Sequence, residues 1–176
     1  MYESDKIDSG LFAIYEQRFA HLRDVPISYL EIGIARGGSL LWAREFFQHP
    51  ESRILGVDKR IAPMLPSGIG QRICNQNDHV GLARIGFECG PFDIIIDDGS
   101  HLPKETRTAF KALWPFVGRG GYYVIEDWTA PFTHGDYYNG IELVVTDIAR
   151  ELPRYGIVDC AILANPNCSL AIYRKR

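Results

Sequence analysis

The segment that most limits how this chain can fold is FDIIIDDGSH, residues 92–101, an isoleucine run that ends abruptly in polar residues. A continuous run of branched apolar residues predicts a strand that is buried on both faces of a parallel sheet. Polar groups at the carboxyl end of such a strand lie where α/β folds place their binding and catalytic residues. We therefore take Asp97, Asp98 and His101 as candidate site residues.

Strand-like and helix-like segments alternate along the rest of the chain. A helix is expected over about residues 8–22, and further helices at about 40–47, 80–85, from Pro103 onward, and 141–152. Strands are expected at 27–33, 53–58, 71–74, 92–97, 122–125, 157–163 and 169–173. Gly118–Gly121 is expected to stop the helix that begins at Pro103, and Asn165–Asn167 to form a hairpin turn.

This order predicts an α/β fold with a doubly wound, Rossmann-like sheet. The sheet should have seven strands, mostly parallel, with an antiparallel hairpin at its C-terminal end. With 176 residues, 46% of them hydrophobic, the chain should form a single domain over residues 1–176, with 1–25 as a helical lead-in.

Charge and hydropathy exclude several classes of partner. The net charge of -3 gives no sign of a nucleic-acid partner, and no apolar run approaches the ~20 residues that span a bilayer. The N-terminus lacks the apolar core of a signal peptide. The four cysteines are widely spaced and read as reduced thiols, so we expect a cytoplasmic protein.

A glycine-containing loop, EIGIARGGS at residues 31–39, joins the first expected strand to a helix. Its glycines let the backbone come close to a ligand. Gly33 and Gly37 are four residues apart and Ala35 lies between them, which differs from the G-x-G-x-x-G of nicotinamide and flavin sites. Any tight strand–helix turn can recruit glycines, so the spacing leaves a purely structural role open.

Acid-x-Gly-x-x-x-Gly resembles motif I of class I S-adenosylmethionine-dependent methyltransferases. The resemblance implies that this loop wraps the amino-acid part of the cofactor. It also implies that Asp58, which ends the second expected strand, bonds the ribose hydroxyls. A helix-capping or surface role for Asp58 is the alternative. The cofactor-binding residues from the loop and this strand would be Glu31, Gly33, Gly37, Ser39 and Asp58.

Two acidic strand ends should meet at one rim of the sheet. If 92–97 and 122–125 are neighbouring strands, Asp97-Asp98 and Glu126-Asp127 converge beside the Gly33 loop. Two like charges ~4 Å apart repel by ~4 kcal/mol at an effective dielectric of 20, so the acids need protons, a basic side chain or a cation. A divalent cation fits best, and oxygen ligands favour Mg²⁺, with Mn²⁺ or Ca²⁺ as alternatives. The acids could instead cap helices or pair with Arg107 or Arg119.

His101 follows Asp98 by three residues, in the turn before the next helix. Histidine exchanges protons near neutral pH, so His101 beside a metal-bound hydroxyl could act as a general base. A role as a metal ligand is equally compatible with the spacing, and many lone histidines are structural.

The motifs DDGSH at 97–101 and GGYYVIED at 120–127 resemble the metal-dependent sugar O-methyltransferases of the macrocin and mycinamicin family. The resemblance runs from Ser4-Asp5-Lys6 to the second motif. It implies Asp98, Glu126 and Asp127 as magnesium ligands and His101 as the base that deprotonates a sugar hydroxyl.

The same resemblance implies that Gln76 and Asp78 lie near the adenine end of the cofactor. Asp97 would face the cofactor or support the metal ligands from behind. Asn75 departs from the acid of the family pattern, and Gly10-Leu11-Phe12 stands where that pattern has His-x-Tyr. These departures make the identity of the substrate less certain, but not the type of reaction.

We therefore expect a methyltransferase that uses S-adenosylmethionine and Mg²⁺, or Mn²⁺, on a hydroxyl of a small molecule, most simply a sugar of a glycosylated natural product. The aromatic segment 128–138 would be an acceptor wall or lid, a packed interface or an oligomer contact, and a homo-oligomer is an open alternative. A catechol or phenol methyltransferase, or a non-catalytic cofactor-binding partner, are the competing functions. A nicotinamide oxidoreductase fits the loop least well.

Overall fold

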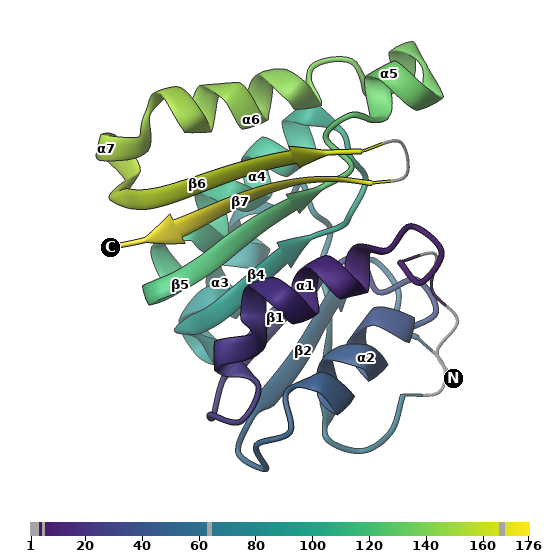
Figure 1. Cartoon of the computed structure of the whole chain (residues 1–176), viewed down its shortest axis with the longest axis vertical. Coiled ribbons are helices and arrows are strands. Elements are labelled where there is room, and N and C mark those ends of the chain that lie inside the picture. Colours follow the sequence, from purple (N-terminus) through teal and green to yellow (C-terminus); the bar gives the residue numbers. More distant parts are fainter. Residues whose placement is uncertain (1–3, 5, 63–64, 166–167) are drawn as a thin grey trace.

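The computed structural model describes residues 4, 6–62, 65–165 and 168–176, and a single twisted sheet runs through its centre (Figure 1). The strands are β1 (Ser28–Ile32), β2 (Arg53–Asp58), β3 (Ile69–Ile73), β4 (Phe92–Asp97), β5 (Val117–Glu126), β6 (Ile157–Ala164) and β7 (Ser169–Lys175). Their order in the sheet is β3-β2-β1-β4-β5-β7-β6. Strands β1 to β5 pair in parallel, and β7 is antiparallel to both β5 and β6. This confirms the predicted seven-stranded, doubly wound fold.

Helices cover both faces of the sheet. The α-helices are α1 (Leu11–Phe19), α2 (Gly38–Phe46), α3 (His79–Cys89), α4 (Pro103–Leu113), α5 (Ala130–His134), α6 (Ile141–Arg150) and α7 (Leu152–Tyr155). Three 3₁₀ turns add η1 (Ala20–Leu22), η2 (Trp114–Phe116) and η3 (Asp136–Tyr138). Buried side chains of α1 and α2 form one core cluster, and those of α3, α4 and α6 form the other.

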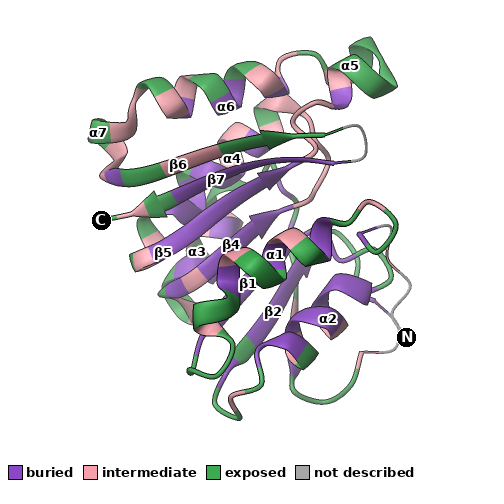
Figure 2. Ribbon diagram, viewed as in Figure 1, coloured by how far each residue is buried: buried purple, intermediate pink, exposed green. Residues whose placement is uncertain are grey.

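The isoleucine run of β4 lies between these two clusters. Ile94 and Ile96 pack in the α1–α2 cluster, whereas Ile95 packs in the cluster under α3 and α4. All three are 0% exposed, and Figure 2 shows β4 as part of the buried centre of the sheet. The prediction of a strand buried on both faces is confirmed, and it fixes where the carboxyl end of β4 emerges.

Several boundaries differ from the expected ones. Strand β5 begins at Val117, so Gly118–Gly121 lies inside the strand and does not stop α4, which gives way to η2. A Cβ on Gly121 would lie 3.0 Å from three backbone oxygens, so close backbone approach explains the glycine there. Helix α3 is longer than expected, α1 begins only at Leu11, and the aromatic segment contains α5 and η3. The predicted turn residues Pro166 and Asn167 lie outside the described residues.

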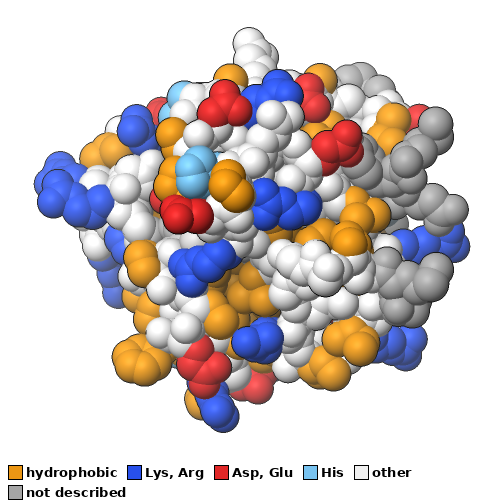
Figure 3. Space-filling model, turned by 90° about the horizontal axis from the view of Figure 1, so that it is seen from below, with side chains coloured by type: hydrophobic (Ala, Val, Ile, Leu, Met, Phe, Trp, Pro, Cys, Tyr) orange, Lys and Arg blue, Asp and Glu red, His pale blue; other side chains and the backbone are white. Residues whose placement is uncertain are grey.

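The surface in Figure 3 carries acidic and basic side chains interspersed with hydrophobic ones, so neither charge dominates the coloured part of this face. Within the described ranges, no helix is both long and apolar enough to cross a membrane.

Candidate functional site

The carboxyl ends of β1, β4 and β5 bring the predicted acids to one edge of the sheet. Asp97 lies opposite Ile125 in the parallel β4–β5 pair, so Asp98 and Glu126 follow side by side. The backbone N–H of Asp98 donates to the carbonyl of Ile32 in β1 at 3.0 Å. The predicted convergence of the two acidic motifs beside the first loop is therefore confirmed.

Three hollows open at this edge, and they share walls. The Asp58 hollow, of about 310 Å³, lies between the ends of β1, β2 and β4 and includes Gly33, Gln76 and Ser100. The Arg36 hollow, of about 390 Å³, is formed by the loop from Gly33 to Ser39 with Lys6 and Asp98. The His101 hollow, of about 360 Å³, is lined by Lys6, His101, Glu126, Asp127 and side chains of the α5–η3 segment. Gly33 joins the first two hollows, and Lys6 joins the last two.

Gly33 is held against the chain that follows β4. Its backbone has φ +94°, and a Cβ built there would lie 1.9 Å from the carbonyl oxygen of Asp98. Both features require glycine, since an L side chain would be strained and would collide with backbone. The loop therefore lies directly on the strand end that carries the acids.

The polar floor of the Asp58 hollow is a connected set of hydrogen bonds. Asp58 accepts from the backbone N–H of Ile34 at 2.8 Å, which ties the end of β2 to the Gly33 loop. The Gln76 side-chain oxygen accepts from the N–H and the hydroxyl of Ser100, both at 2.8 Å. The Gln76 amide donates to Asp97 at 2.6 Å, so Gln76 links the hollow to the buried end of β4.

The other predicted cofactor residues have different positions. Ser39 lines the Arg36 hollow, but Glu31, Gly37, Asp78 and Asp97 are not among the described residues that line these hollows. Asp78 caps α3 by accepting from the N–H of Gly81 at 3.0 Å. Gly37, at φ +86°, precedes α2. Glu31, Gly37 and Asp97 are buried, whereas Asp78 is exposed.

Asp97 is 2% exposed and hydrogen-bonds to the Tyr123 hydroxyl at 3.2 Å as well as to Gln76. Burial raises the pKa of Asp97 to about 8, although the hydrogen bonds from Tyr123 and the Gly99 backbone act in the opposite direction. Below about pH 8 the folded protein therefore favours the protonated form of Asp97. The sequence alone left the role of this residue open.

This raised pKa predicts a pH dependence of stability. In the unfolded chain the pKa of an aspartate carboxyl is near 4. The contribution of Asp97 to the unfolding free energy is fully present below this pH and is lost as the pH rises through about 8, the pKa in the folded protein. One such proton lowers the unfolding free energy by at most about 1.4 kcal/mol per pH unit over this range. We expect Asp97→Asn to make this decrease with pH smaller. Urea unfolding between about pH 5 and pH 8 measures it. The exposed Asp24→Asn variant is the control, and an unchanged pH slope in Asp97→Asn would contradict the assignment.

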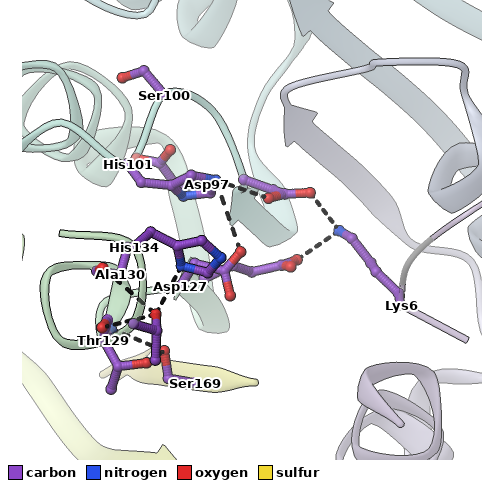
Figure 4. Close-up of polar contacts among 12 residues, drawn as sticks. Lys6, Asp97, Ser100, His101, Asp127, Thr129, Ala130, His134 and Ser169 are labelled. Atoms are coloured by element: carbon purple, nitrogen blue, oxygen red, sulfur yellow. Dashed lines mark hydrogen bonds and ion pairs between the residues drawn. The ribbon is translucent and has the colours of Figure 1, made fainter. Parts of the chain in front are cut away.

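A buried lysine, Lys6, lies among three of the acids. Figure 4 shows its ammonium turned toward carboxylates at the strand ends. The Lys6 ammonium is 2.8 Å from Glu31 Oε1, 2.9 Å from Asp98 Oδ2 and 2.7 Å from Glu126 Oε1. Tyr15 also donates to Glu126 Oε1 at 2.7 Å. We call Glu31, Asp98 and Glu126 the inner acid cluster.

Electrostatics keep this lysine charged. Burial by itself lowers the pKa of Lys6, but attraction to Asp98, Glu126 and Glu31 outweighs it, so the pKa is raised well above its usual value. Burial, followed by the charge of Asp98, raises the pKa of Glu126, and the ammonium opposes this rise. The Lys6 ammonium thus supplies part of the positive charge that the sequence analysis expected beside these acids.

Lys6 and Tyr15 are site residues that sequence reasoning missed. The need for a counter-charge was apparent, but the candidate partners were Arg107 and Arg119. Arg107 instead pairs with Asp147 on α6 at 2.8 Å. Arg119 lies near the start of β5, at the opposite end of the strand from Glu126.

A second group of possible ligands surrounds His101, and two of its members, His101 and Asp127, line the His101 hollow. His101 Nε2 is 3.7 Å from Asp98 Oδ1 and 3.8 Å from Asp127 Oδ2 (Figure 4). The ligand atoms of these residues lie within 4.8 Å of one another, and all three side chains are partly exposed. We call Asp98, His101 and Asp127 the outer cluster. Asp98 belongs to both clusters, with one carboxylate oxygen facing each.

The outer cluster includes two strained backbones. His101 has φ +56° and Asp127 has φ +52°, in the left-handed region that non-glycine residues rarely adopt. Such strain persists where the surrounding structure holds it, and it concentrates at functional sites. His101 lies four residues after the end of β4, Asp127 directly follows β5, and both residues line the His101 hollow.

The aromatic segment covers two of the hollows. Tyr137 lines the Asp58 hollow, whereas the adjacent Tyr138 lines the His101 hollow together with His134. The Tyr138 ring centroid is 6.4 Å from that of His101 and 6.3 Å from that of His134. Tyr138 therefore faces the same hollow as His101, and the role of the segment stays a prediction.

Comparison with known proteins places these features in context. Residues 30–128 match a family described as a methyltransferase domain. The chain is 44% identical over 126 residues to an 8-demethyl-8-(2-methoxy-alpha-L-rhamnosyl)-tetracenomycin-C 3'-O-methyltransferase of Streptomyces olivaceus, covering 66% of this chain and 32% of that protein. It is 42% identical over 127 residues to the mycinamicin VI 2''-O-methyltransferase of Micromonospora griseorubida, covering 66% of this chain and 31% of that protein.

A solved structure agrees with the fold. The MycE methyltransferase from the mycinamycin pathway, in complex with Mg, SAH and mycinamycin VI, has a TM-score of 0.76 and 31% identity to this chain. The match covers 93% of this chain and 49% of that one. The chain thus spans about a third of the length of these curated relatives and about half of the solved chain.

Proposed function

The chain belongs to the methyltransferase domain family, and from this premise we propose that it transfers a methyl group from S-adenosylmethionine to a hydroxyl of a glycosylated small molecule. The observation that carries the proposal is the edge where the Gly33 loop, the acids and His101 meet in adjoining hollows. The names of two similar proteins, which give a rhamnosyl-tetracenomycin and mycinamicin VI, support a glycosylated acceptor.

In the proposed arrangement, the adenosine part of the cofactor occupies the Asp58 hollow and its amino-acid part occupies the Arg36 hollow. The carboxylate of Asp58 would accept hydrogen bonds from the ribose hydroxyls. Gly33 lines both of these hollows. Asp97 and Gln76 hold Ser100 in place at the floor. Burial of the reactive end against the acids would keep water from it.

The acids also fit a magnesium ion. Carboxylate oxygens are the donors that Mg²⁺ prefers, and Asp98 and Asp127 present them beside the His101 hollow. Glu126 lines the same hollow, while Lys6 and Tyr15 both bond to its Oε1. We therefore retain Asp98, Glu126 and Asp127 as the residues that would hold the ion. When bound there, Mg²⁺ would lower the pKa of an acceptor hydroxyl.

The remaining steps use side chains of this chain. His101 Nε2 faces the hollow near both acids and would accept the proton from the acceptor hydroxyl. Tyr138 and His134 would hold the acceptor ring against the opposite wall. The Gly33 loop and the strand ends would orient cofactor and acceptor so that the oxygen faces the methyl group.

The metal assignment is tested by calorimetric titration with Mg²⁺ and S-adenosylhomocysteine. We expect Asp127→Asn and Asp98→Asn to weaken Mg²⁺ binding at least about 10-fold, because each removes a charged ligand. Binding of S-adenosylhomocysteine to Asp127→Asn should stay close to that of the native protein. Asp147→Asn, which removes a surface carboxylate paired with Arg107, is the control. Mg²⁺ binding by both site variants that equals native binding would exclude these ligands.

A catechol or phenol acceptor is the second candidate, favoured by the aromatic wall at Tyr138. Phenols ionise near pH 10 and need less activation than a sugar hydroxyl. Assaying a glycoside and a catechol side by side with the native protein separates the two acceptors. Methyl transfer to the catechol alone would replace the sugar acceptor with a phenolic one.

A further inference from the structure

Lys6 lies on the boundary between the cofactor side and the acceptor side of the site. It is 5% exposed, yet it lines both the Arg36 hollow and the His101 hollow. Its ammonium reaches acids from three strands, Glu31 at the end of β1, Asp98 after β4 and Glu126 at the end of β5. One side chain from the N-terminal segment therefore connects strand ends that are distant in the sequence.

The ammonium occupies the place where a cation would bind the inner acid cluster. The three carboxylates each offer an oxygen within 4.8 Å of the others, so the cluster by itself resembles a metal site. Lys6 contacts all three at hydrogen-bond distance. Tyr29 further bonds to Glu31 at 3.0 Å, and Tyr15 bonds to Glu126, which holds these oxygens in place.

The two carboxylate oxygens of Asp98 face different partners, one on the inner side and one on the outer side of the site. Oδ2 faces Lys6 at 2.9 Å, whereas Oδ1 faces His101 at 3.7 Å. A divalent ion near the ammonium would meet strong repulsion, since even two unit charges ~4 Å apart repel by ~4 kcal/mol at an effective dielectric of 20. Only the oxygens on the His101 side remain favourable for such an ion.

We propose that Lys6 is a positioning residue that fills the inner acid cluster with an internal cation and so confines a divalent ion to the side of Asp98, Glu126 and Asp127 that faces His101. The inference rests on the proposed function for the identity of that ion. Its consequence is that the ion lies next to the base and the acceptor hollow, rather than deep between β1 and β5.

Counting bound Mn²⁺ by electron paramagnetic resonance tests the inference, because Mn²⁺ has the same preference for oxygen ligands. We expect the native protein to bind one Mn²⁺ and Lys6→Met to bind two, since methionine keeps the stem but leaves three carboxylates without their cation. The additional ion should disappear in Lys6→Met/Glu31→Gln, because Glu31 belongs only to the inner cluster. Lys111→Met, at the exposed last turn of α4, makes the same change in net charge and should bind one ion.

The outcomes separate this inference from the proposed function. An unchanged count in Lys6→Met, or a loss of all binding, would overturn the role of Lys6 even if the native protein binds one ion. If the native protein binds none and Lys6→Met binds one, the role of Lys6 stands and the metal part of the proposed function falls. If Lys6→Met folds only when Mn²⁺ is added, as judged by near-ultraviolet circular dichroism, the inference is supported. The inference would be contradicted if Lys6→Met fails to fold both with and without Mn²⁺ while Lys6→Met/Glu31→Gln folds and binds one ion.

Discussion

Replacing His101 with asparagine is expected to lower the rate of methyl transfer by about 10²–10⁴-fold, the usual contribution of a positioned general base. Asparagine tolerates the left-handed backbone that His101 adopts at φ +56°, so the loss should come from the missing base and not from the fold. The measurement is the turnover number with a glycosylated acceptor at saturating cofactor. Affinity for S-adenosylhomocysteine should stay close to the native value.

Two other histidines provide the controls. His79→Ala, at the exposed start of α3, should leave the rate unchanged. His134→Ala removes a wall of the His101 hollow and should affect the Michaelis constant of the acceptor more than turnover. A collapse of turnover in His134→Ala with near-native turnover in His101→Asn would move the role of the base to His134.

The second large effect is expected for Gly33→Ala. The added methyl would overlap the backbone oxygen of Asp98, which no side-chain rotation can relieve, and φ +94° adds strain. We expect a loss of about 3 kcal/mol or more in unfolding free energy, together with loss of S-adenosylhomocysteine binding. Urea unfolding and calorimetric titration measure the two effects.

Gly68→Ala is a matched control for backbone strain alone. Gly68 has φ +104°, and a Cβ there would meet none of the described residues within 4 Å. It should therefore lose only about 1–2 kcal/mol and keep cofactor binding. Equal losses in the two variants would mean that the backbone angle, and not contact with Asp98, dictates glycine at position 33.

The sheet and the meeting of the two acidic motifs could be predicted because they depend on local patterns. The isoleucines of β4 indicated a strand buried on both faces, and parallel pairing then placed Asp98 beside Glu126. The start of β5 was wrong because glycines usually break structure, whereas Gly121 fits close backbone contact within the strand. Local sequence cannot distinguish these two uses of glycine.

The internal counter-charge could not be predicted for a different reason. Lys6 is 25 residues from Glu31 and 120 from Glu126 in the sequence, and no periodicity connects them. Its role depends on the path of the segment before α1, which the packing of α1 against α2 and β5 fixes. Sequence reasoning could state that the acids needed compensation, but not which side chain would provide it.

The left-handed backbones of His101 and Asp127 have a consequence for engineering this protein. Glycine would adopt both conformations without strain, so substitutions that relieve stored strain lie where they would remove the proposed base and one proposed ligand. A selection for heat resistance alone would then favour variants that survive heating but no longer work. Screens should therefore hold positions 101 and 127 fixed and seek stability elsewhere, such as the exposed faces of α3 and α6.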